Sequence, residues 1–278
     1  MFCTNCGTTL PEDVRFCTQC GAPVATPNAV PAQAAPAAPP PPVAASPFRP
    51  LRFEIFGGQL PAVSIRLDPG ESVYTQAGGM AWMDAGVQMD TNMKGGLGKA
   101  LGRMFSGESL FMATYSATAP NQEFVACSTM AGTILPLELR GQQAIIAQRS
   151  AFLVAQPSIA LSAFVTRSFG AGLFGGEGFV MQRISGTGFV FLEIDGSLAQ
   201  RTLAPGESIR VEHGHVAAFE EGVQYSAQMV KGFKNILFGG EGLFMATLTG
   251  PGKVWLQTMT IPGFAKELIP YLPKPSSN

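Results

Sequence analysis

Four of the five cysteines stand in two closely spaced pairs near the start of the sequence. Cys3 and Cys6 form the first pair, Cys17 and Cys20 form the second, and a glycine follows each pair. A Cys-x-x-Cys pair directs two thiolates at one ion, and two pairs fill the tetrahedral shell of zinc. Glycine suits the left-handed turn that such a pair requires. The spacing therefore predicts a zinc ribbon over residues 1–21, with one structural Zn²⁺ and no open coordination position for catalysis.

The two histidines of the sequence, His213 and His215, are two positions apart, so strand alternation would place both on one face. A catalytic metal site with three protein ligands needs another ligand, and no further histidine is present to supply it. We interpret the pair as ordinary surface or turn residues, with a metal-dependent enzyme as an alternative. Two neighbouring histidines also assemble no Ser-His-Asp or Cys-His constellation. The sequence therefore predicts a protein that is not an enzyme.

Two motifs recur through the rest of the sequence. The first is Pro69-Gly70-Glu71-Ser72, which returns as Pro205-Gly206-Glu207-Ser208 and in a degenerate form at Arg140-Gly141-Gln142. The second contains Glu108, Glu177 and Glu241, each preceded by glycine and followed by a short apolar run. Motifs that return at a nearly fixed interval indicate one structural unit built three times.

The three glutamates of the second motif occupy the same place in each repeat. We expect Glu108, Glu177 and Glu241 to accept backbone N–H groups at a turn. Convergence of the three carboxylates on a common axis, where they would bind a cation, is the alternative.

The stretch just before the second motif of each repeat (93–105, 167–174 and 231–238) combines basic residues, glycine and large apolar residues, and it contains no acidic residue. Pseudo-threefold packing would gather these segments at one end of the molecule. An anionic membrane suits that combination, because each basic residue near the surface contributes about 1 kcal/mol in addition to apolar insertion. The alternative is that the apolar residues plug the ends of the sheets. The residues concerned are Lys94, Lys99 and Arg103, then Arg167 and Phe169, and then Lys231, Phe233 and Lys234.

The rest of the sequence divides into a linker, a body and a tail. Residues 22–50 consist mostly of alanine and proline, which favours a semi-rigid spacer. Residues 51–270 contain β-branched and aromatic runs bounded by glycine and proline turns, and 271–278 form the tail. We expect an all-β body of three tandem units in a pseudo-threefold arrangement, each covering the open sheet edges of the others.

Composition excludes several classes of protein. A net charge of −1 shows no basic excess, so nucleic-acid binding is not favoured. No run approaches the roughly 20 apolar residues that span a bilayer, and no secretory signal or presequence is visible. We expect a cytoplasmic protein that also lies peripherally at the inner face of the membrane.

Through both repeated motifs, residues 51 to about 265 resemble the altered-inheritance-of-mitochondria family, long catalogued as a bacterial domain of unknown function. The resemblance implies a TRAP-like fold, named for the tryptophan-responsive RNA-binding attenuation protein, which is a short relative of the double-stranded β-helix and is present here in triplicate. A fungal member is linked to mitochondrial inner-membrane organisation, and no catalytic residues carry over. The zinc ribbon and the missing presequence favour a bacterial cytosolic form.

These observations together predict a scaffold or adaptor without enzymatic activity. Its body would engage an anionic membrane surface or a membrane protein, its ribbon would bind a protein partner, and open sheet edges would allow self-association. A nucleic-acid-binding regulator that uses the ribbon and the TRAP-like body together is an alternative, as is the metal-dependent enzyme at His213 and His215.

Overall fold

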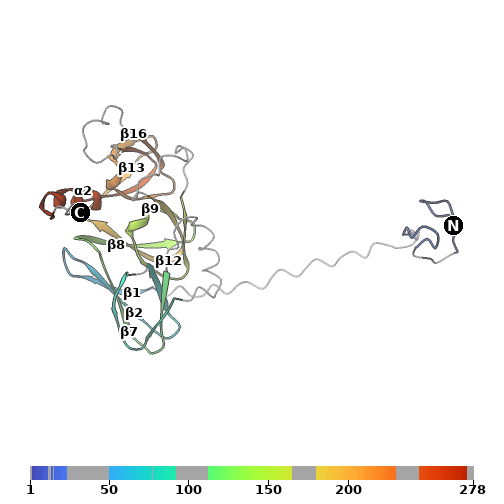
Figure 1. The fold of residues 1–278 in the computed structure, drawn as a ribbon, viewed down its shortest axis with the longest axis horizontal. Coiled ribbons are helices and arrows are strands. Elements are labelled where there is room, and N and C mark those ends of the chain that lie inside the picture. The colour runs from blue at the N-terminus through green and yellow to red at the C-terminus, as the bar shows by residue number, and fades with distance from the viewer. Residues whose placement is uncertain are drawn as a thin grey trace, which may run out of the picture. The chain divides into compact units, whose positions relative to one another are not determined.

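The computed structural model describes residues 2–11, 14, 16–23, 50–76, 78–91, 112–164, 180–229 and 244–273. The chain divides into two compact units, Met1–Pro47 and Phe48–Asn278, which we call the ribbon unit and the body. Strands dominate the described part of the body (Figure 1). The prediction of an all-β protein with a small zinc ribbon is therefore confirmed.

The body begins with an additional strand, β1 (Arg52–Phe56), and six strands follow that we call segment 1. These six are β2 (Ala62–Leu67), β3 (Ser72–Gln76), β4 (Met80–Met83), β5 (Val87–Asp90), β6 (Met112–Ala117) and β7 (Gln122–Cys127). Strand β7 pairs with β2 on one side and with β4 on the other. Strand β6 pairs in the same way with β3 and β5, and β1 adds to the free side of β2. All of these pairs are antiparallel.

Segment 2 follows the same scheme with one strand fewer. Its elements are β8 (Gly132–Arg140), β9 (Ile145–Gln148), η1 (Arg149–Ala151), β10 (Phe152–Ala155), β11 (Ile159–Ala163) and β12 (Met181–Asp195). The second half of β12 pairs with β8 and β10, and its first half pairs with β9 and β11. The single strand β12 thus occupies the positions that β6 and β7 share in the pairing scheme of segment 1.

Segment 3 restores the six-strand form. Its elements are β13 (Leu198–Leu203), β14 (Ser208–Glu212), η2 (His213–His215), β15 (Val216–Glu220), β16 (Gln224–Met229), β17 (Phe244–Thr249) and β18 (Gly252–Gln257). Strand β18 pairs with β13 and β15, and β17 pairs with β14 and β16. The same pairing scheme therefore occurs in three successive segments, and the pseudo-threefold arrangement of these segments stays a prediction.

Each segment also carries an irregularity at the same point. The register shifts between Met80 and Trp82 in β4, between Phe152 and Val154 in β10, and around Ala217 in β15. A bulge of this kind bends the strand and increases its twist. Because the bulge recurs at the same point of the pairing scheme, it can be used to align the residues of the three segments with one another.

Strand pairing also joins the segments to one another. Strand β10 of segment 2 pairs with β3 of segment 1, and β15 of segment 3 pairs with β9 of segment 2. These joins produce one sheet of 11 strands, beside a four-stranded sheet that ends at β4 and a three-stranded sheet that begins at β14. Among the described residues, no pairing joins β4 to β14, so only two of the three expected edge closures are present.

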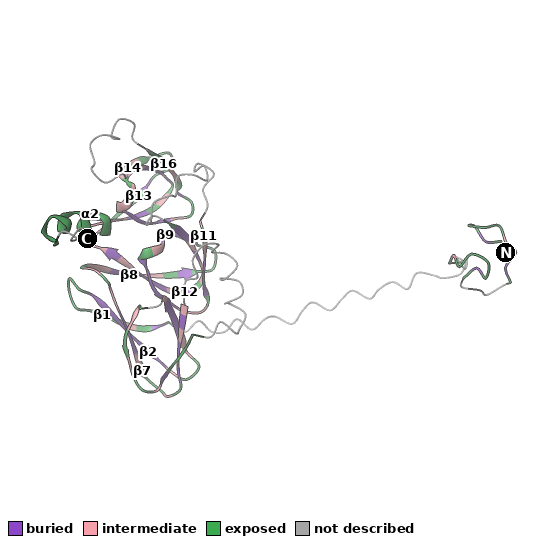
Figure 2. Cartoon of the chain, viewed as in Figure 1, coloured by how far each residue is buried: buried purple, intermediate pink, exposed green. Residues whose placement is uncertain are grey.

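Apolar side chains of the strands fill the space between the sheets. In β6, alternate residues are buried, as a strand with one face towards the core requires. Three phenylalanines, Phe124, Phe191 and Phe219, are completely buried. Buried residues follow the strands through all three segments (Figure 2). They form three clusters, each of which contains residues from more than one segment and so helps to hold the segments together.

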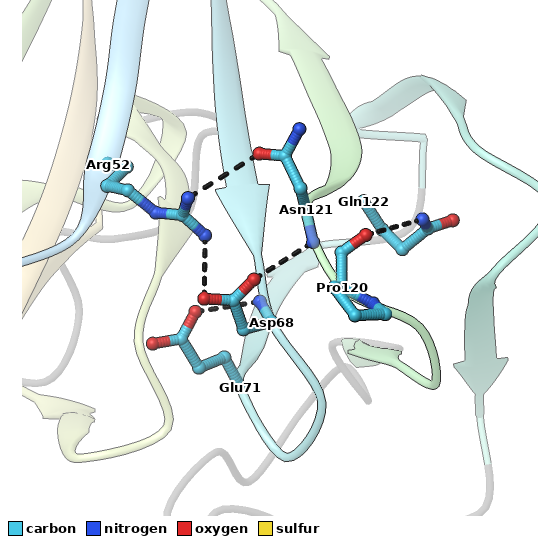
Figure 3. A network of polar contacts seen from close by, with 6 residues as sticks. All are labelled: Arg52, Asp68, Glu71, Pro120, Asn121 and Gln122. Carbon is cyan, nitrogen blue, oxygen red and sulfur yellow. Dashed lines mark hydrogen bonds and ion pairs between the residues drawn. The ribbon is translucent and has the colours of Figure 1, made fainter.

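The first repeated motif forms a turn before the second strand of its segment. Gly70 has a φ of +85°, a value that glycine adopts at little cost. The Glu71 carboxylate accepts a 2.8 Å hydrogen bond from the Asp68 backbone N–H, and Asp68 in turn forms a 3.0 Å ion pair with Arg52 (Figure 3). The Asn121 backbone N–H donates to the other Asp68 oxygen at 2.9 Å. The motif thus ties the turn to the neighbouring hairpin.

The corresponding turn of segment 3 has the same construction. Gly206 has a φ of +80°, and the Glu207 carboxylate accepts a 2.9 Å hydrogen bond from the Ala204 backbone N–H. Gly141, in the degenerate copy, has a φ of +81°. The repeated Pro-Gly-Glu sequence is therefore a structural element of the turn.

Helix α2 (Ile261–Leu268) follows β18 and continues into η4 (Ile269–Tyr271). The Thr260 hydroxyl caps it by accepting a 3.1 Å hydrogen bond from the Gly263 N–H, and proline occupies the first turn. No residue of this helix is buried.

Candidate functional site

The four cysteine sulfurs of the ribbon unit come together in one cluster. All four Sγ atoms lie within 4.8 Å of one another, and the Cys3–Cys20 and Cys6–Cys17 separations are both 3.6 Å. Zinc bound tetrahedrally at about 2.3 Å from each sulfur places neighbouring sulfurs about 3.8 Å apart. The donor set and its spacing therefore fit a Zn²⁺ ion.

The backbone of both pairs forms the same knuckle. The Gly7 N–H donates to the Cys3 carbonyl at 2.9 Å, and the Gly21 N–H donates to the Cys17 carbonyl at 2.8 Å. Both glycines have a positive φ, +74° and +70°, as the sequence predicted. Each knuckle thereby aims two sulfurs at a common point.

Protonation of the exposed thiols depends on their neighbours. Hydrogen bonds with the Thr8 side chain and backbone lower the pKa of Cys6 to about 6. The Ala22 backbone lowers the pKa of Cys20, but its hydrogen bond with Cys6 and partial desolvation act in the opposite direction, and that pKa is raised to about 11. Thiolate is the form that binds a metal.

One aromatic ring stands outside each knuckle. Phe2 and Phe16 precede the first cysteine of their pairs and are 72% and 64% exposed. Both bridge across their knuckle, to Thr9 and Pro23 respectively. Sequence reasoning on the metal ligands passed over these rings, although the repeated Phe-Cys-x-x-Cys-Gly pattern marks them.

The two histidines lie in η2 between β14 and β15. The Nδ1 atom of His215 is 2.8 Å from the Gln257 carbonyl, and its Nε2 atom is 3.8 Å from a Glu212 oxygen. Among the described residues, the four cysteines are the one group of three or more side chains placed to hold a metal ion. The histidine positions thus add no second cluster there.

A small cavity of about 130 Å³ lies where segments 2 and 3 meet α2, lined in part by Glu193, Asp195, Gln257 and Ile261. Burial raises the pKa of the Glu193 carboxyl, which also accepts a 2.8 Å hydrogen bond from the Thr129 N–H. Burial raises the pKa of Asp195 as well. The hydrogen bonds of Glu193 connect the end of β12 to the chain after β7, which is a structural role.

The predicted surface residues and repeat glutamates lie outside the described residues. These are Lys94, Lys99, Arg103, Arg167, Phe169, Lys231, Phe233 and Lys234, together with Glu108, Glu177 and Glu241. Their grouping at one end of the body stays a prediction.

The described body presents an apolar surface that we call the α2 face. Ile261, Phe264 and Leu268 follow helical spacing and are 45%, 42% and 44% exposed. Ile269, Tyr271 and Leu272 extend the α2 face and are more exposed still. No helix among the described residues is long and apolar enough to cross a membrane. The periodicity of Ile261 to Leu268 could have identified this face from the sequence.

Comparisons with known proteins identify both parts of the chain. Residues 2–24 match the zinc-ribbon domain, and residues 53–259 match the family described as "Mitochondrial biogenesis AIM24". An uncharacterized protein of Streptococcus pyogenes serotype M6 is 34% identical over 237 residues, which cover 82% of this chain and 93% of that protein.

Two further relatives agree. The "Altered inheritance of mitochondria protein 24, mitochondrial" of the fungus Verticillium alfalfae is 26% identical over 170 residues, which cover 60% of this chain and 43% of that protein. A Streptococcus pyogenes protein solved by X-ray crystallography is 29% identical, with a TM-score of 0.65, and the match covers 80% of this chain and 100% of that one. The resemblance inferred from the repeated motifs is confirmed, and the chain belongs to the mitochondrial biogenesis AIM24 family.

Proposed function

We propose that this protein is a scaffold or adaptor without enzymatic activity, whose body binds a membrane surface from the cytoplasmic side. The observation that carries this proposal is the α2 face. Contiguous apolar surface on a soluble domain marks an interaction site, and a short helix with one apolar side suits the boundary between headgroups and acyl chains.

The strength of that binding follows from the exposed area. Complete burial of one large apolar side chain contributes about 1.5–3 kcal/mol. The helical positions of the α2 face are a little under half exposed, so insertion gains roughly 1 kcal/mol for each. Six such residues approach the reversible binding of a single acyl chain, with a partition constant on the order of 10⁴ M⁻¹. Stable binding then needs a second contribution, which we assign to the basic residues that precede the second motif in each repeat.

We further propose that the ribbon unit holds one structural Zn²⁺ and binds a protein partner. The four-cysteine cluster supports the metal. The exposed rings of Phe2 and Phe16 support the partner, because aromatic side chains dominate the binding energy of protein interfaces.

Flotation of the full chain with vesicles tests the membrane role. We expect the wild type to float with anionic vesicles and the double variant Phe264→Ser, Leu268→Ser to float at least tenfold less. Leu60→Ser, Met89→Ser is the matched control, because Leu60 and Met89 are apolar residues outside α2 that are at least as exposed, at 67% and 52%.

A second variant tests whether the ribbon unit contributes to membrane binding. Phe2→Ala, Phe16→Ala should float like the wild type, because the ribbon unit is assigned to a protein partner. Equal flotation of the α2 variant and the wild type would refute the membrane role of α2, and loss of flotation in the ribbon variant would move membrane binding to the ribbon unit.

A further inference from the structure

Two strand pairings inside the body follow one rule. In each, the strand that carries the bulge pairs with the second strand of the preceding segment. Strand β10 meets β3 with Val154 opposite Thr75 and Ala155 opposite Tyr74. Strand β15 meets β9 with Ala218 opposite Ala147 and Phe219 opposite Ile146. These two joins are versions of one interface.

This rule leaves two strands without such a partner: one strand that carries the bulge and one second strand of a segment. Strand β4 has the bulge but follows no earlier segment, and β14 is the second strand of the last segment. Among the described residues, β4 pairs only with β7 and β14 only with β17. The exposure of β4 agrees with a free edge: Trp82 in β4 is 47% exposed, whereas the equivalent residues Val154 in β10 and Ala218 in β15 are completely buried.

The free sides of these strands carry backbone groups that can pair. The Asp84 N–H donates to the Glu123 carbonyl at 2.9 Å, so the neighbouring Met83 directs its own N–H and C=O away from β7. The Gly250 N–H donates to the Glu207 carbonyl at 2.9 Å, and alternation along β14 then directs the groups of Arg210 away from β17. Each edge therefore presents an amide and a carbonyl, at a defined residue, that no described strand pairs with.

The register of the internal joins brings those two residues together. Alignment on the bulge makes Trp82 and Met83 equivalent to Val154 and Ala155. The β14 residues equivalent to Thr75 and Tyr74 are Val211 and Arg210. Transferring the β10–β3 register places Met83 opposite Arg210, the pair whose backbone groups face outwards. Two separate observations, register and hydrogen-bond alternation, thus select the same pair.

The body does not bring its own two edges together. The strands of segment 1 lie at one end, those of segment 3 at the other, and β9 and β12 lie between them (Figure 1). We propose that a second copy of this chain completes each edge, with β4 of one copy pairing antiparallel with β14 of the next. The contact is head-to-tail, because it joins two different edges. This inference does not depend on the membrane role of α2.

One side chain makes this interface weaker than the internal joins. Gln76 and Gln148, the last residues of β3 and β9, donate to carbonyls of the following segment. Glu212 occupies the equivalent place in β14, and a carboxylate accepts hydrogen bonds but does not donate them. The contact between copies therefore lacks a bond that both internal joins contain, which makes it reversible. Glu212→Gln should restore the donor and strengthen association about fivefold, as expected for one hydrogen bond.

Sedimentation velocity of the full chain tests the proposal. At about 100 µM, above the micromolar Kd expected of a small contact, the wild type should sediment as an assembly heavier than the 29.2 kDa chain. Met83→Pro and Arg210→Pro each remove one outward N–H and should both be monomeric. Met83→Ala and Arg210→Ala keep the amide and should assemble like the wild type.

Mixing the two proline variants gives the sharpest result. Each variant alone lacks one half of every contact, but one keeps an intact β14 and the other an intact β4. The mixture should therefore form a dimer and nothing larger. A mixture that stays monomeric would overturn the head-to-tail pairing. A monomeric wild type would overturn the proposal without any variant, so the test stands even if a proline variant fails to fold.

Discussion

Gln148 provides the most direct check on how the segments are joined. Its side chain is 8% exposed, and its Nε2 donates to the Gly214 carbonyl at 3.0 Å and to the Val216 carbonyl at 2.8 Å. Each such bond is worth about 1 kcal/mol, and a buried carbonyl left without a donor adds to the loss. Gln148→Ala should therefore destabilise the body by about 2–3 kcal/mol.

The equivalent residue of segment 1 should matter less. Gln76 makes one longer bond, 3.3 Å to the Arg149 carbonyl, and Gln182 donates to that same carbonyl at 3.4 Å. Gln76→Ala should cost at most about 1 kcal/mol, because the carbonyl keeps a donor. The difference between the two variants is thus predicted from their contacts alone.

Thermal melting of the full chain measures both effects. For a domain of this size 1 kcal/mol shifts the Tm by roughly 2–4 °C, so Gln148→Ala should melt about 5–10 °C below the wild type and Gln76→Ala about 2–3 °C below. Gln88→Ala, an exposed strand position, is the control and should not change the Tm. A Gln148→Ala protein that melts like the wild type, or a larger loss from Gln76→Ala, would refute this account of the joins.

Three other predictions concern the metal, the turn and the buried carboxyl. The purified chain should contain one zinc per molecule by atomic absorption, and Cys17→Ser should abolish that zinc while leaving the Tm of the body unchanged, because the two parts are separate compact units. Glu207→Ala should lower the free energy of unfolding in urea by about 1 kcal/mol, because the Ala204 N–H loses its acceptor. Glu193 has a folded pKa raised above the unfolded value of about 4.3, so its stabilising contribution is complete below that pH and is lost as the pH rises through the folded pKa. Urea unfolding from about pH 4 to pH 7 should therefore show the wild type losing stability relative to Glu193→Gln, and a constant difference would contradict the raised pKa.

Local signals made the ribbon and the turns predictable. The Cys-x-x-Cys-Gly pattern determines both the ligands and the left-handed glycine of each knuckle. The Pro-Gly-Glu motif likewise predicts a turn, because Gly70 and Gly206 need a positive φ. The role of Glu71 and Glu207 as acceptors for the N–H three residues earlier became clear only from the structure.

Contacts between distant segments could not be predicted from the sequence. The pairing of β9 with β15 depends on the register of two strands far apart in the chain, and no local pattern encodes that register. Strand β14 does differ from its paired equivalents β3 and β9, because it carries Arg210 and Glu212 where they carry no charge, but charged residues in a strand do not by themselves identify a free edge. The periodicity of α2 predicts an apolar side, but only the fold reveals that no described element covers it.

Flotation of the wild-type chain with neutral and with anionic vesicles, at low and at high salt, tests the proposed function most directly. The account predicts flotation with anionic vesicles that high salt weakens, because the basic residues and the α2 face act together. Absence of flotation with either vesicle at either salt concentration would contradict it.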